Sequence, residues 1–420
     1  MKKTFSVISL GCFRNTYDSE VLSHKLSSKG YVFSPHFPQG KRNIKKTDTL
    51  ILNTCGFIDK AKEESLDAIK EAINRKKKGL VKKIVVSGCL AQRYKDELKK
   101  SFPQVDKWQG VEDFSSKAQE RIKILPFHID FLKICEGCLN KCTFCAIPLI
   151  KGPLKSKSSK AVVQEVRKLD RAGTGELNVI GQDITSWGRD FKNKENLTGL
   201  LKKILKEAKN IRWIRLIYTH PKHFDDSLIE LIAKEKKICK YIDLPIQHIN
   251  DRILKLMNRG ITKREIIALI KKIRKKIPNC VIRTSVIVGF PGETKREFEE
   301  LLDFLGKVKF ERLGAFIYSR EESTPAYNLP AQVHPSTKAR RLREVMSLQQ
   351  QIAKEAASKF IGREIDILVE GKETGVFLGR SQYDAPEVDG IVYLRRKGLK
   401  MGEFYRAKII DSLEYDLIGV

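Results

Sequence analysis

The stretch Cys138-Leu-Asn-Lys-Cys142-Thr-Phe-Cys145 carries three cysteines at CxxxCxxC spacing. This spacing places three thiolates on one short loop. Thiolates are the usual ligands of iron–sulfur clusters, and a four-iron cluster normally takes four of them. Three thiolates from one loop leave one iron without a protein ligand, and a small molecule can bind there. The stretch therefore predicts a cluster that is open to a small-molecule cofactor.

A zinc site and a disulfide are the alternatives for these cysteines. Zinc sites usually combine paired CxxC motifs with a fourth Cys or His. His128 lies ten residues upstream of Cys138, but this half of the chain has no second CxxC pair. Disulfides belong to oxidising compartments, and nothing in the sequence indicates export. Cys135 adds a fourth local thiol, which we interpret as a buried bystander because it precedes the loop on an expected strand.

The overall composition is that of a soluble globular protein with two or three domains. The chain has 420 residues, of which 41% are hydrophobic and 31% are charged. It has no run of eighteen apolar residues, and its first ten residues do not resemble a signal peptide. We therefore expect a cytoplasmic protein with no membrane partner. Nine cysteines in such a chain favour metal or redox chemistry.

The net charge of +30 is unevenly distributed along the chain. Residues 1–125 carry a net charge of +12 and residues 126–360 carry +20, whereas residues 361–420 carry 9 Lys and Arg against 11 Asp and Glu. Contact with RNA is possible for such a chain. Most basic runs fall on helical patterns, however, and we interpret them as solvated helix faces.

The first third of the chain alternates strand and helix signals. Short apolar runs predict buried parallel strands at Phe5–Leu10, Leu50–Asn53 and Ile84–Val86, and the clearest helical pattern is Ile58–Lys77. We therefore expect residues 1–120 to form an open parallel α/β domain with helices on both faces of its sheet.

A cysteine follows each of these three strands, namely Cys12, Cys55 and Cys89. Ligands collect beyond the carboxyl ends of parallel strands, so the three side chains should meet at one edge of the sheet. A single cysteine there is usually a small apolar filler. Three of them, with Gly11 and Gly88 permitting close backbone approach, predict a second cluster.

Six further strand signals, each followed by a helical pattern, predict a partial (βα)6 barrel over residues 126–355. The strands are expected at Phe131–Cys135, Leu177–Ile180, Trp213–Tyr218, Tyr241–Leu244, Val281–Val288 and Leu313–Phe316. Helices are expected at Ile261–Lys276, Lys295–Gly306 and Ser336–Lys359, among others. The cysteine loop directly follows the first strand, which places it at the reactive end of the barrel.

Three motifs resemble the N-terminal domain of the methylthiotransferases, a family of the radical S-adenosylmethionine (SAM) superfamily. They are Leu10-Gly-Cys12-Phe-Arg-Asn15, Asn53-Thr-Cys55-Gly-Phe-Ile58 and Ser87-Gly-Cys89-Leu-Ala-Gln-Arg93. The resemblance covers essentially the whole chain, including the spacing of the Cys138 loop. The family usually has Pro-Lys where this chain has Phe13-Arg14. The resemblance implies two 4Fe–4S clusters, and it places Phe144, Gln182, Asp243 and Arg283 near SAM.

The last sixty residues contain short strand signals separated by glycine turns, which predict a small β-barrel over residues 360–420. The runs are Glu364–Val369, Gly375–Leu378, Gly390–Leu394, Glu403–Ile410 and Leu417–Val420. At this place the family has a TRAM domain. Asp384, Glu387 and Asp389 make this segment locally acidic. We expect these three carboxylates to dock a basic substrate protein.

The resemblance is greatest to the branch of the family that modifies small-subunit ribosomal protein S twelve. The stretches that carry it are Asp384–Gly390, Tyr318–Ala326 and Tyr415–Gly419. It implies insertion of a methylthio group at the β-carbon of an aspartate in that protein or in the assembled small ribosomal subunit. This C–H bond is not acidic, so the reaction needs radical chemistry, which cofactors supply.

By the same resemblance, the cluster on the Cys138 loop binds SAM and, once reduced, splits it to start the radical reaction. The cluster on Cys12, Cys55 and Cys89 supplies the sulfur, methylated by a second SAM. A low-potential donor such as flavodoxin or ferredoxin is the expected electron source. The alternatives are a tRNA adenosine methylthiotransferase and a non-catalytic iron–sulfur ribosome-binding factor.

Overall fold

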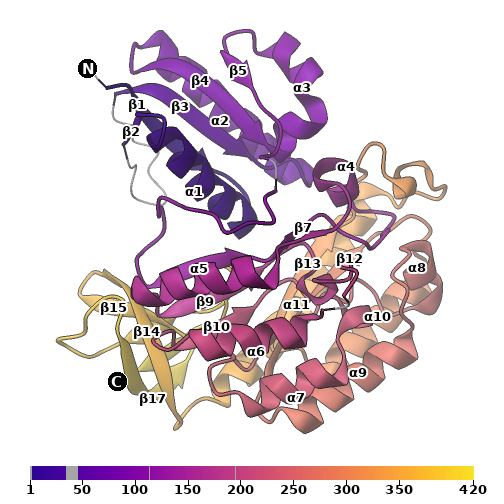
Figure 1. The fold of residues 1–420 in the computed structure, drawn as a ribbon. Helices are drawn as coiled ribbons and strands as arrows, with labels where there is room; N and C mark the ends of the chain where they lie inside the picture. The colour runs from indigo at the N-terminus through magenta and orange to yellow at the C-terminus, as the bar shows by residue number, and fades with distance from the viewer. Residues whose placement is uncertain (1, 35–45, 113, 194) are drawn as a thin grey trace.

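The computed structural model describes residues 2–34, 46–112, 114–193 and 195–420 (Figure 1). Three β-structures follow one another along the chain: an open parallel sheet, a partial barrel of parallel strands and a small closed barrel. This is the predicted fold class. Within the described ranges, no helix is both long enough and apolar enough to cross a membrane.

The N-terminal sheet is entirely parallel, with strand order β2-β1-β3-β4-β5. Its strands are β1 (Thr4–Ser9), β2 (Val32–Phe33), β3 (Thr47–Thr54), β4 (Val81–Gly88) and β5 (Lys107–Trp108). The helices are α1 (Phe13–Ser27), α2 (Asp59–Lys77) and α3 (Cys89–Ser101). The register pairs Ser9 with Asn53, and Asn53 with Ser87. The carboxyl ends of the three central strands are therefore level with one another.

Alternating side chains of the central strands bury against helices on opposite faces of this sheet. Leu50 and Leu52 of β3 pack in one cluster with Ile69 of α2 and with residues of α3. Ile51, between them, packs on the other face together with Leu22 of α1. Successive side chains of a strand point to opposite faces, so one apolar strand serves both layers. The predicted two-sided α/β arrangement is confirmed.

The middle of the chain forms two parallel three-stranded sheets, β10-β9-β6 and β11-β12-β13, joined by a bridge between Ile214 and Ile238. The strands are β6 (Ile129–Lys133), β9 (Glu176–Ile180), β10 (Trp213–Leu216), β11 (Tyr241–Asp243), β12 (Val281–Val288) and β13 (Arg312–Ile317). The covering helices are α5 (Ser159–Arg171), α6 (Leu197–Glu207), α7 (Asp226–Lys234), α9 (Lys263–Lys276), α10 (Lys295–Val308) and α11 (Pro335–Ser358). The six βα units are those predicted.

The strand that leads to the cysteine loop differs from the expectation. It ends at Lys133 rather than at Cys135. Cys135–Glu136 instead form β7, which pairs antiparallel with β8 (Lys155–Ser156). The chain thus leaves the parallel sheet after Lys133. The segment between β7 and β8 contains the cysteine loop and the short helix α4 (Ile147–Lys151).

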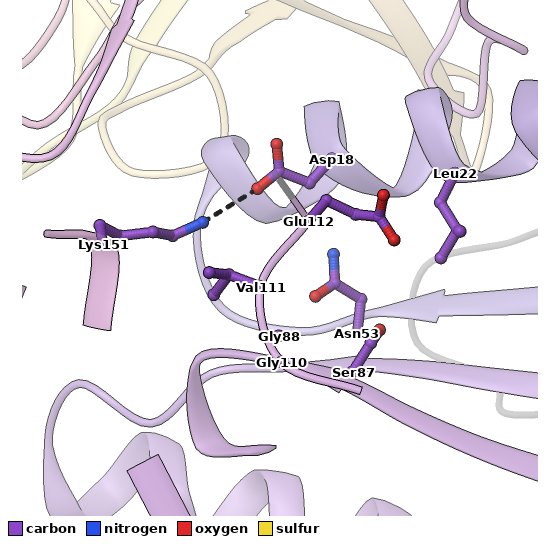
Figure 2. A pocket seen from close by; sticks show the side chains of 9 residues that line it. All are labelled: Asp18, Leu22, Asn53, Ser87, Gly88, Gly110, Val111, Glu112 and Lys151. Atoms are coloured by element: carbon purple, nitrogen blue, oxygen red, sulfur yellow. Dashed lines mark hydrogen bonds and ion pairs between the residues drawn. The ribbon is translucent and has the colours of Figure 1, made fainter. Parts of the chain in front are cut away.

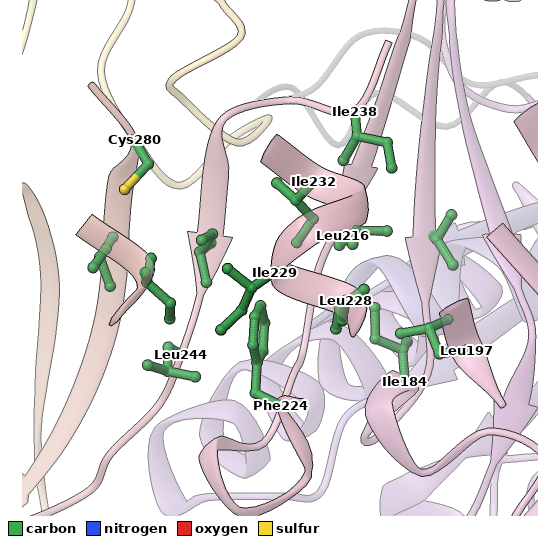
Figure 3. Packing of buried hydrophobic residues seen from close by; sticks show 14 of the residues in the cluster. Ile184, Leu197, Leu216, Phe224, Leu228, Ile229, Ile232, Ile238, Leu244 and Cys280 are labelled. Carbon is green, nitrogen blue, oxygen red and sulfur yellow. The ribbon is translucent and has the colours of Figure 1, made fainter. Parts of the chain in front are cut away.

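The largest core lies between the strands of the partial barrel and its surrounding helices. Leu228, Ile229 and Ile232 form one apolar face of α7, at the spacing that places residues on the same side of a helix. Figure 3 shows these side chains among Leu216 and Leu244 of the strand layer. This packing holds the strands in place, so that their ends can position a site.

The C-terminal segment forms a closed barrel of order β14-β15-β16-β18-β17, and the prediction of five strands is confirmed. The strands are β14 (Glu364–Glu373), β15 (Val376–Ser381), β16 (Val392–Leu394), β17 (Phe404–Ser412) and β18 (Leu417–Gly419). β14 runs four residues further than expected. The reason is a tight hairpin at Thr374 and Gly375, which have positive φ angles of 46° and 89° and so continue the pairing to its end.

The C-terminal barrel covers the amino-terminal end of the partial barrel. The first residues of four strands, Ile129, Trp213, Tyr241 and Val281, belong to one buried cluster with apolar residues of the small barrel. The ring of Trp213 meets that of Phe404 edge to face at 4.8 Å. The carboxyl-terminal ends of the strands, where a site is expected, are at the opposite end.

The prediction that Asp384, Glu387 and Asp389 form an acidic docking surface is wrong. Asp384 is only 2% exposed and accepts hydrogen bonds from Nε and Nη2 of Arg312, at 2.9 and 2.5 Å. Asp389 accepts a hydrogen bond from the Tyr241 hydroxyl at 2.7 Å. Of the three, Glu387 alone is exposed. The acidic stretch instead pairs with cations of the partial barrel, because a buried arginine requires a counter-charge.

Candidate functional site

The Cys138, Cys142 and Cys145 side chains lie on the loop between β7 and α4. Cys142 is buried and the other two are half-buried. Gly137, just before the loop, has φ of +72°, and a Cβ atom there would lie 2.1 Å from the Pro153 carbonyl oxygen. A glycine is therefore needed to start the loop at this point.

A polar network ties this loop to the carboxyl end of β9. Asn140 lies within the motif and donates from Nδ2 to the Asp183 carboxylate at 2.8 Å, and its backbone N–H donates to Cys138 Sγ at 3.4 Å. Asp183 also accepts from the Ser186 hydroxyl at 2.6 Å and lies 3.0 Å from Nδ1 of His223. Burial would raise the pKa of Asp183, but its hydrogen bonds, that with His223 first, hold the pKa well below its usual range.

Burial affects the charge of two of the loop thiols, Cys138 and Cys145. Burial raises the pKa of Cys145 to about 12 and also raises the pKa of Cys138. Thiolates are stabilised by a bound metal cation, which is why cysteine ligands lose their protons when metal binds. The three thiols thus fit the role of ligands to a positively charged iron core.

Cys12, Cys55 and Cys89 come together at the carboxyl edge of the N-terminal sheet. Cys12 directly precedes α1, Cys55 directly follows β3, and Cys89 is the first residue of α3. Asn15 links the strand ends, because its Nδ2 donates to the Leu10 carbonyl at 2.8 Å and to the Thr54 carbonyl at 3.1 Å. Its Oδ1 lies 3.9 Å from the Sγ of Cys89.

The three thiols of this second group differ in their electrostatic environments. Burial would raise the pKa of Cys12, but the charge and the hydrogen bond of Arg14 outweigh it and lower the pKa. Burial raises the pKa of Cys89 to about 12, and burial with the nearby Cys12 raises the pKa of Cys55. The charge of Cys12 raises the pKa of both Cys55 and Cys89, and that of Cys55 also raises the pKa of Cys89.

Arg14 connects the two cysteine groups. Its Nε donates to Cys12 Sγ at 3.4 Å, and its Nη1 donates at 3.4 Å to the carbonyl of Gly181, which follows β9. The guanidinium lies 4.5 Å from the ring centroid of Tyr218, which follows β10. Its charge also acts on Cys145 of the first group. Arg14 belongs to the Phe13-Arg14 pair, which stands where the resemblance leads us to expect Pro-Lys.

The N-terminal unit covers the carboxyl ends of the barrel strands at other points as well. Glu321, beyond the end of β13, pairs at 2.7 Å with Arg93 of α3 and at 2.7 Å with Lys62 of α2. At the end of β6, Lys133 pairs with Asp18 of α1 at 2.6 Å. These contacts hold the second cysteine group over the end of the barrel that carries the first.

Lys133 and Asp18 belong to a buried square of alternating charges that Glu136 and Lys151 complete. Figure 2 shows Lys151 reaching toward Asp18 at the edge of a small cavity. The cavity is lined by Asp18, Leu22, Asn53, Ser87, Gly88, Gly110, Val111, Glu112 and Lys151. Its volume of about 10 Å³ is far below the roughly 300–1,000 Å³ typical of ligand pockets.

The predicted SAM contacts occupy two different places. Gln182 follows β9 beside the first cysteine group, and its Oε1 is buried without a hydrogen-bond partner among the described residues. Phe144 packs against the apolar cluster around Met257. Asp243 and Arg283 are deeper in the barrel. They are paired in register, with Nη1 of Arg283 3.5 Å from the Asp243 carboxylate, and Arg283 also reaches Asp389 at 3.4 Å.

Tyr218 joins these deeper residues to the cysteine groups. Its backbone N–H donates to the Asp243 carboxylate at 2.8 Å, and its φ angle of 67° is unusual for a residue other than glycine. Burial raises the pKa of Asp243, although Arg283 opposes this. Sequence reasoning missed Tyr218, Asn140 and Arg14 as site residues. Asn140 could have been found from its position inside the motif.

The donor set at both places fits an iron–sulfur cluster. In the ranges that the structure covers, no three His, Cys, Asp or Glu side chains are arranged to hold a single metal ion. The thiolates of a 4Fe–4S cluster bind different iron atoms and stand further apart than the ligands of one ion. Each group presents three thiols.

Comparisons with known proteins identify the family of each part of the chain. Three family models match: Uncharacterized protein family UPF0004 over residues 4–110, the Radical SAM superfamily over residues 132–305 and the TRAM domain over residues 361–420. A radical SAM methyltransferase structure, TsrM from Kitasatospora setae with cobalamin and a 4Fe–4S cluster bound, shares the fold with a TM-score of 0.60. It is 14% identical, over 78% of this chain and 77% of that chain.

Much closer relatives match the chain from end to end. It is 41% identical to ribosomal protein uS12 methylthiotransferase RimO of Clostridioides difficile (strain 630), over 98% of this chain and 97% of that protein. It is 42% identical to the protein of the same name from Caldicellulosiruptor saccharolyticus, over 98% of each. The chain therefore belongs to the RimO family of methylthiotransferases, enzymes of the radical SAM superfamily that use SAM and an iron–sulfur cluster.

Proposed function

We propose that this enzyme inserts a methylthio group at the β-carbon of an aspartate in ribosomal protein uS12 (protein S twelve). The observation that carries the proposal is the pair of cysteine groups, Cys138, Cys142 and Cys145 on one side and Cys12, Cys55 and Cys89 on the other, linked through Arg14. Full-length relatives named as uS12 methylthiotransferases support the same substrate. The tRNA alternative has no comparable support.

The two groups would hold two 4Fe–4S clusters with different roles. A cluster on the Cys138 loop would supply an electron to SAM and so provide the radical chemistry that an unactivated C–H bond requires. The second group would carry the sulfur, and two SAM molecules would be used in each turnover. The chain's own part is to hold the two groups facing each other, which Arg14, Asp18 and Glu321 do through their contacts between the units.

Phe144, Gln182, Asp243 and Arg283 are proposed to contact SAM. Gln182 has the strongest support, because its buried Oε1 has no protein partner in the described part of the chain. A buried amide oxygen without a partner costs free energy, and a polar cofactor would remove that cost. Phe144 would offer an apolar contact beside the cysteine loop.

The partners follow from the substrate. We propose a low-potential electron donor of the flavodoxin or ferredoxin kind, a cytoplasmic location where ribosomal proteins are found, and contact with RNA. The TRAM match and the net charge of +30 support the RNA contact. Boundaries at residues 1–120, 126–355 and 360–420 are proposed for the three domains.

Mass spectrometry of a strain lacking this gene tests the proposal. Tryptic peptides of uS12 and digested tRNA nucleosides would be compared from the same cells, complemented with the wild-type gene or with Cys138→Ala. The methylthio group should be absent from the uS12 aspartate in the deletion and in the Cys138→Ala strain, and restored by the wild-type gene. Loss from a tRNA adenosine instead would make the substrate proposal wrong, and no loss from either would favour the non-catalytic alternative.

A further inference from the structure

Four consecutive residues, Leu256 to Arg259, bind the centre of the cysteine loop. The Thr143 hydroxyl donates to the Leu256 carbonyl at 2.8 Å, and the Thr143 N–H donates to the Met257 carbonyl at 3.0 Å. Asn258 Nδ2 donates to the Lys141 carbonyl at 2.8 Å. This clamp begins at the end of helix α8 (Asp251–Leu256) and turns at Asn258, whose φ angle is 53°.

Arg259, the last residue of the clamp, places a positive charge against a cysteine of the loop. Its Nη1 donates to the Sγ of Cys142 at 3.3 Å, and its Nη2 is held by the Pro245 carbonyl at 2.6 Å. Arg259 is 5% exposed and Cys142 is 7% exposed. The guanidinium is thus held in place against a proposed cluster ligand and shielded from water.

Arg259 is also unusual among the buried arginines because it lacks a carboxylate partner. Within the described ranges, the other buried arginines each form an ion pair with Asp or Glu; they are Arg215, Arg312, Arg341 and Arg380. No Asp or Glu of the described chain lies within ion-pair distance of Arg259. Its Nε is likewise buried without a hydrogen-bond partner. Burying a cation without a counter-charge costs free energy, and no carboxylate of the described chain offsets that cost at Arg259.

We propose that Arg259 is the built-in counter-charge of the cluster on Cys138, Cys142 and Cys145, and that it raises the reduction potential of that cluster. This inference rests on the proposed function, which assigns a cluster to the loop. One-electron reduction adds one negative charge to the cluster, with the electron supplied by the low-potential donor. Arg259 itself changes neither bonds nor protons. It is a positioning residue that acts through Cys142.

The direction of the effect follows from electrostatics. A fixed positive charge beside a cluster sulfur stabilises the reduced, more negative state over the oxidised state. Hydrogen bonds to cluster sulfurs and exclusion of solvent are the means by which proteins adjust such potentials. Burial strengthens the effect, because little water remains to screen the charge.

The test measures the midpoint potential of this one cluster by a redox titration followed by electron paramagnetic resonance. The full chain would carry Cys12→Ala, Cys55→Ala and Cys89→Ala, so that only the Cys138 loop can hold a cluster. Arg259→Gln removes the charge, and Arg259→Lys keeps it on a side chain that cannot make both hydrogen bonds. Asn258→Gly is the matched control, because it removes a clamp bond without changing charge and tolerates the positive φ angle.

The potential should become more negative in the order parent chain, Arg259→Lys, Arg259→Gln, with Asn258→Gly close to the parent. An unchanged potential in Arg259→Gln would overturn the proposal, as would an equal shift in Asn258→Gly. Should Arg259→Gln fail to hold a cluster, Arg259→Met, which also removes the charge, decides: a potential equal to the parent's rejects the inference. Absence of any cluster from the parent chain would instead contradict the proposed function.

Discussion

Gly11 and Cys55 are in direct contact across the ends of β1 and β3, since a Cβ atom on Gly11 would lie 2.6 Å from Cys55 Cβ and 2.8 Å from Cys55 Sγ. Gly11→Ala should therefore displace Cys55 and abolish the second cluster while the first is retained. The iron content and the absorbance of the reconstituted protein would report the loss. Gly30→Ala is the matched control, because Gly30 has the same φ angle, +86° against +85°, but nothing within 4 Å of its added Cβ.

Both glycine substitutions force a side chain into the left-handed region, at a cost of about 1 kcal/mol each. Because of this backbone strain, Gly11→Ala and Gly30→Ala should lower the thermal stability by a similar amount. If Gly30→Ala lost as much iron as Gly11→Ala, backbone strain rather than the contact with Cys55 would be the cause.

The two cysteine groups should bind iron independently. The reconstituted protein is expected to contain about eight iron atoms per chain, and about four after all three cysteines of either group are replaced by alanine. Only the cluster on Cys138, Cys142 and Cys145 should change its paramagnetic resonance spectrum when SAM is added. Iron and acid-labile sulfide analysis, with circular dichroism to verify folding, provides the measurement. Full iron retention in either triple variant would exclude that group as ligands.

Asp384 should stabilise the fold rather than bind substrate. Asp384→Ala leaves the buried guanidinium of Arg312 without its counter-charge, which typically costs roughly 3–5 kcal/mol. Asp366→Ala is the control, because the Asp366–Arg212 pair at 3.2 Å in the same interface is 34% and 49% exposed and should contribute less than about 1 kcal/mol. Urea denaturation followed by tryptophan fluorescence would compare the two variants. Equal losses would contradict the distinction between the buried and the exposed pair.

His128 should make the protein sensitive to acid. Burial, followed by the charges of Lys123 and Arg380, lowers the pKa of His128 to about 4, and neither ring nitrogen has a hydrogen-bond partner in the described chain. The unfolded chain, with an ordinary histidine pKa near 6.5, takes up the proton more readily. The contribution of neutral His128 to the free energy of unfolding is therefore complete above pH 6.5 and is lost as the pH falls toward 4.

The substitution His128→Leu isolates this contribution from those of other titrating groups. The thermal midpoint of the wild-type protein should fall further between pH 7.5 and pH 5 than that of His128→Leu. An identical fall in the two proteins would show that His128 is not responsible.

The positions of the six candidate ligands could be predicted from the sequence because they depend on local patterns. Cys12, Cys55 and Cys89 each follow a short apolar run, and parallel strands must end at a common edge of their sheet. The loop of Cys138, Cys142 and Cys145 carries its own spacing. The six strands of the partial barrel and the five-stranded C-terminal barrel likewise follow from apolar runs and glycine turns.

The end of the first barrel strand was misplaced for a physical reason. Apolar residues stand on both sides of Lys133, namely Leu132 before it and Ile134 and Cys135 after it, so the pattern contains no turn signal for the break after Lys133. That break depends on the pairing of β7 with β8, which lies twenty residues further along the chain. Pairing between segments so far apart has no local signature.

The sequence by itself determined which residues could hold clusters, because strand periodicity and ligand spacing are properties of neighbouring residues. Only the tertiary structure decided which charges meet. Arg259 and Cys142 are 117 positions apart, Arg14 and Gly181 are 167 apart, and Arg312 and Asp384 are 72 apart. A charged side chain pairs with whatever group shares its buried environment. Burial is set by the packing of whole domains, so the acidic stretch near Asp384 became an internal ion pair instead of a docking surface.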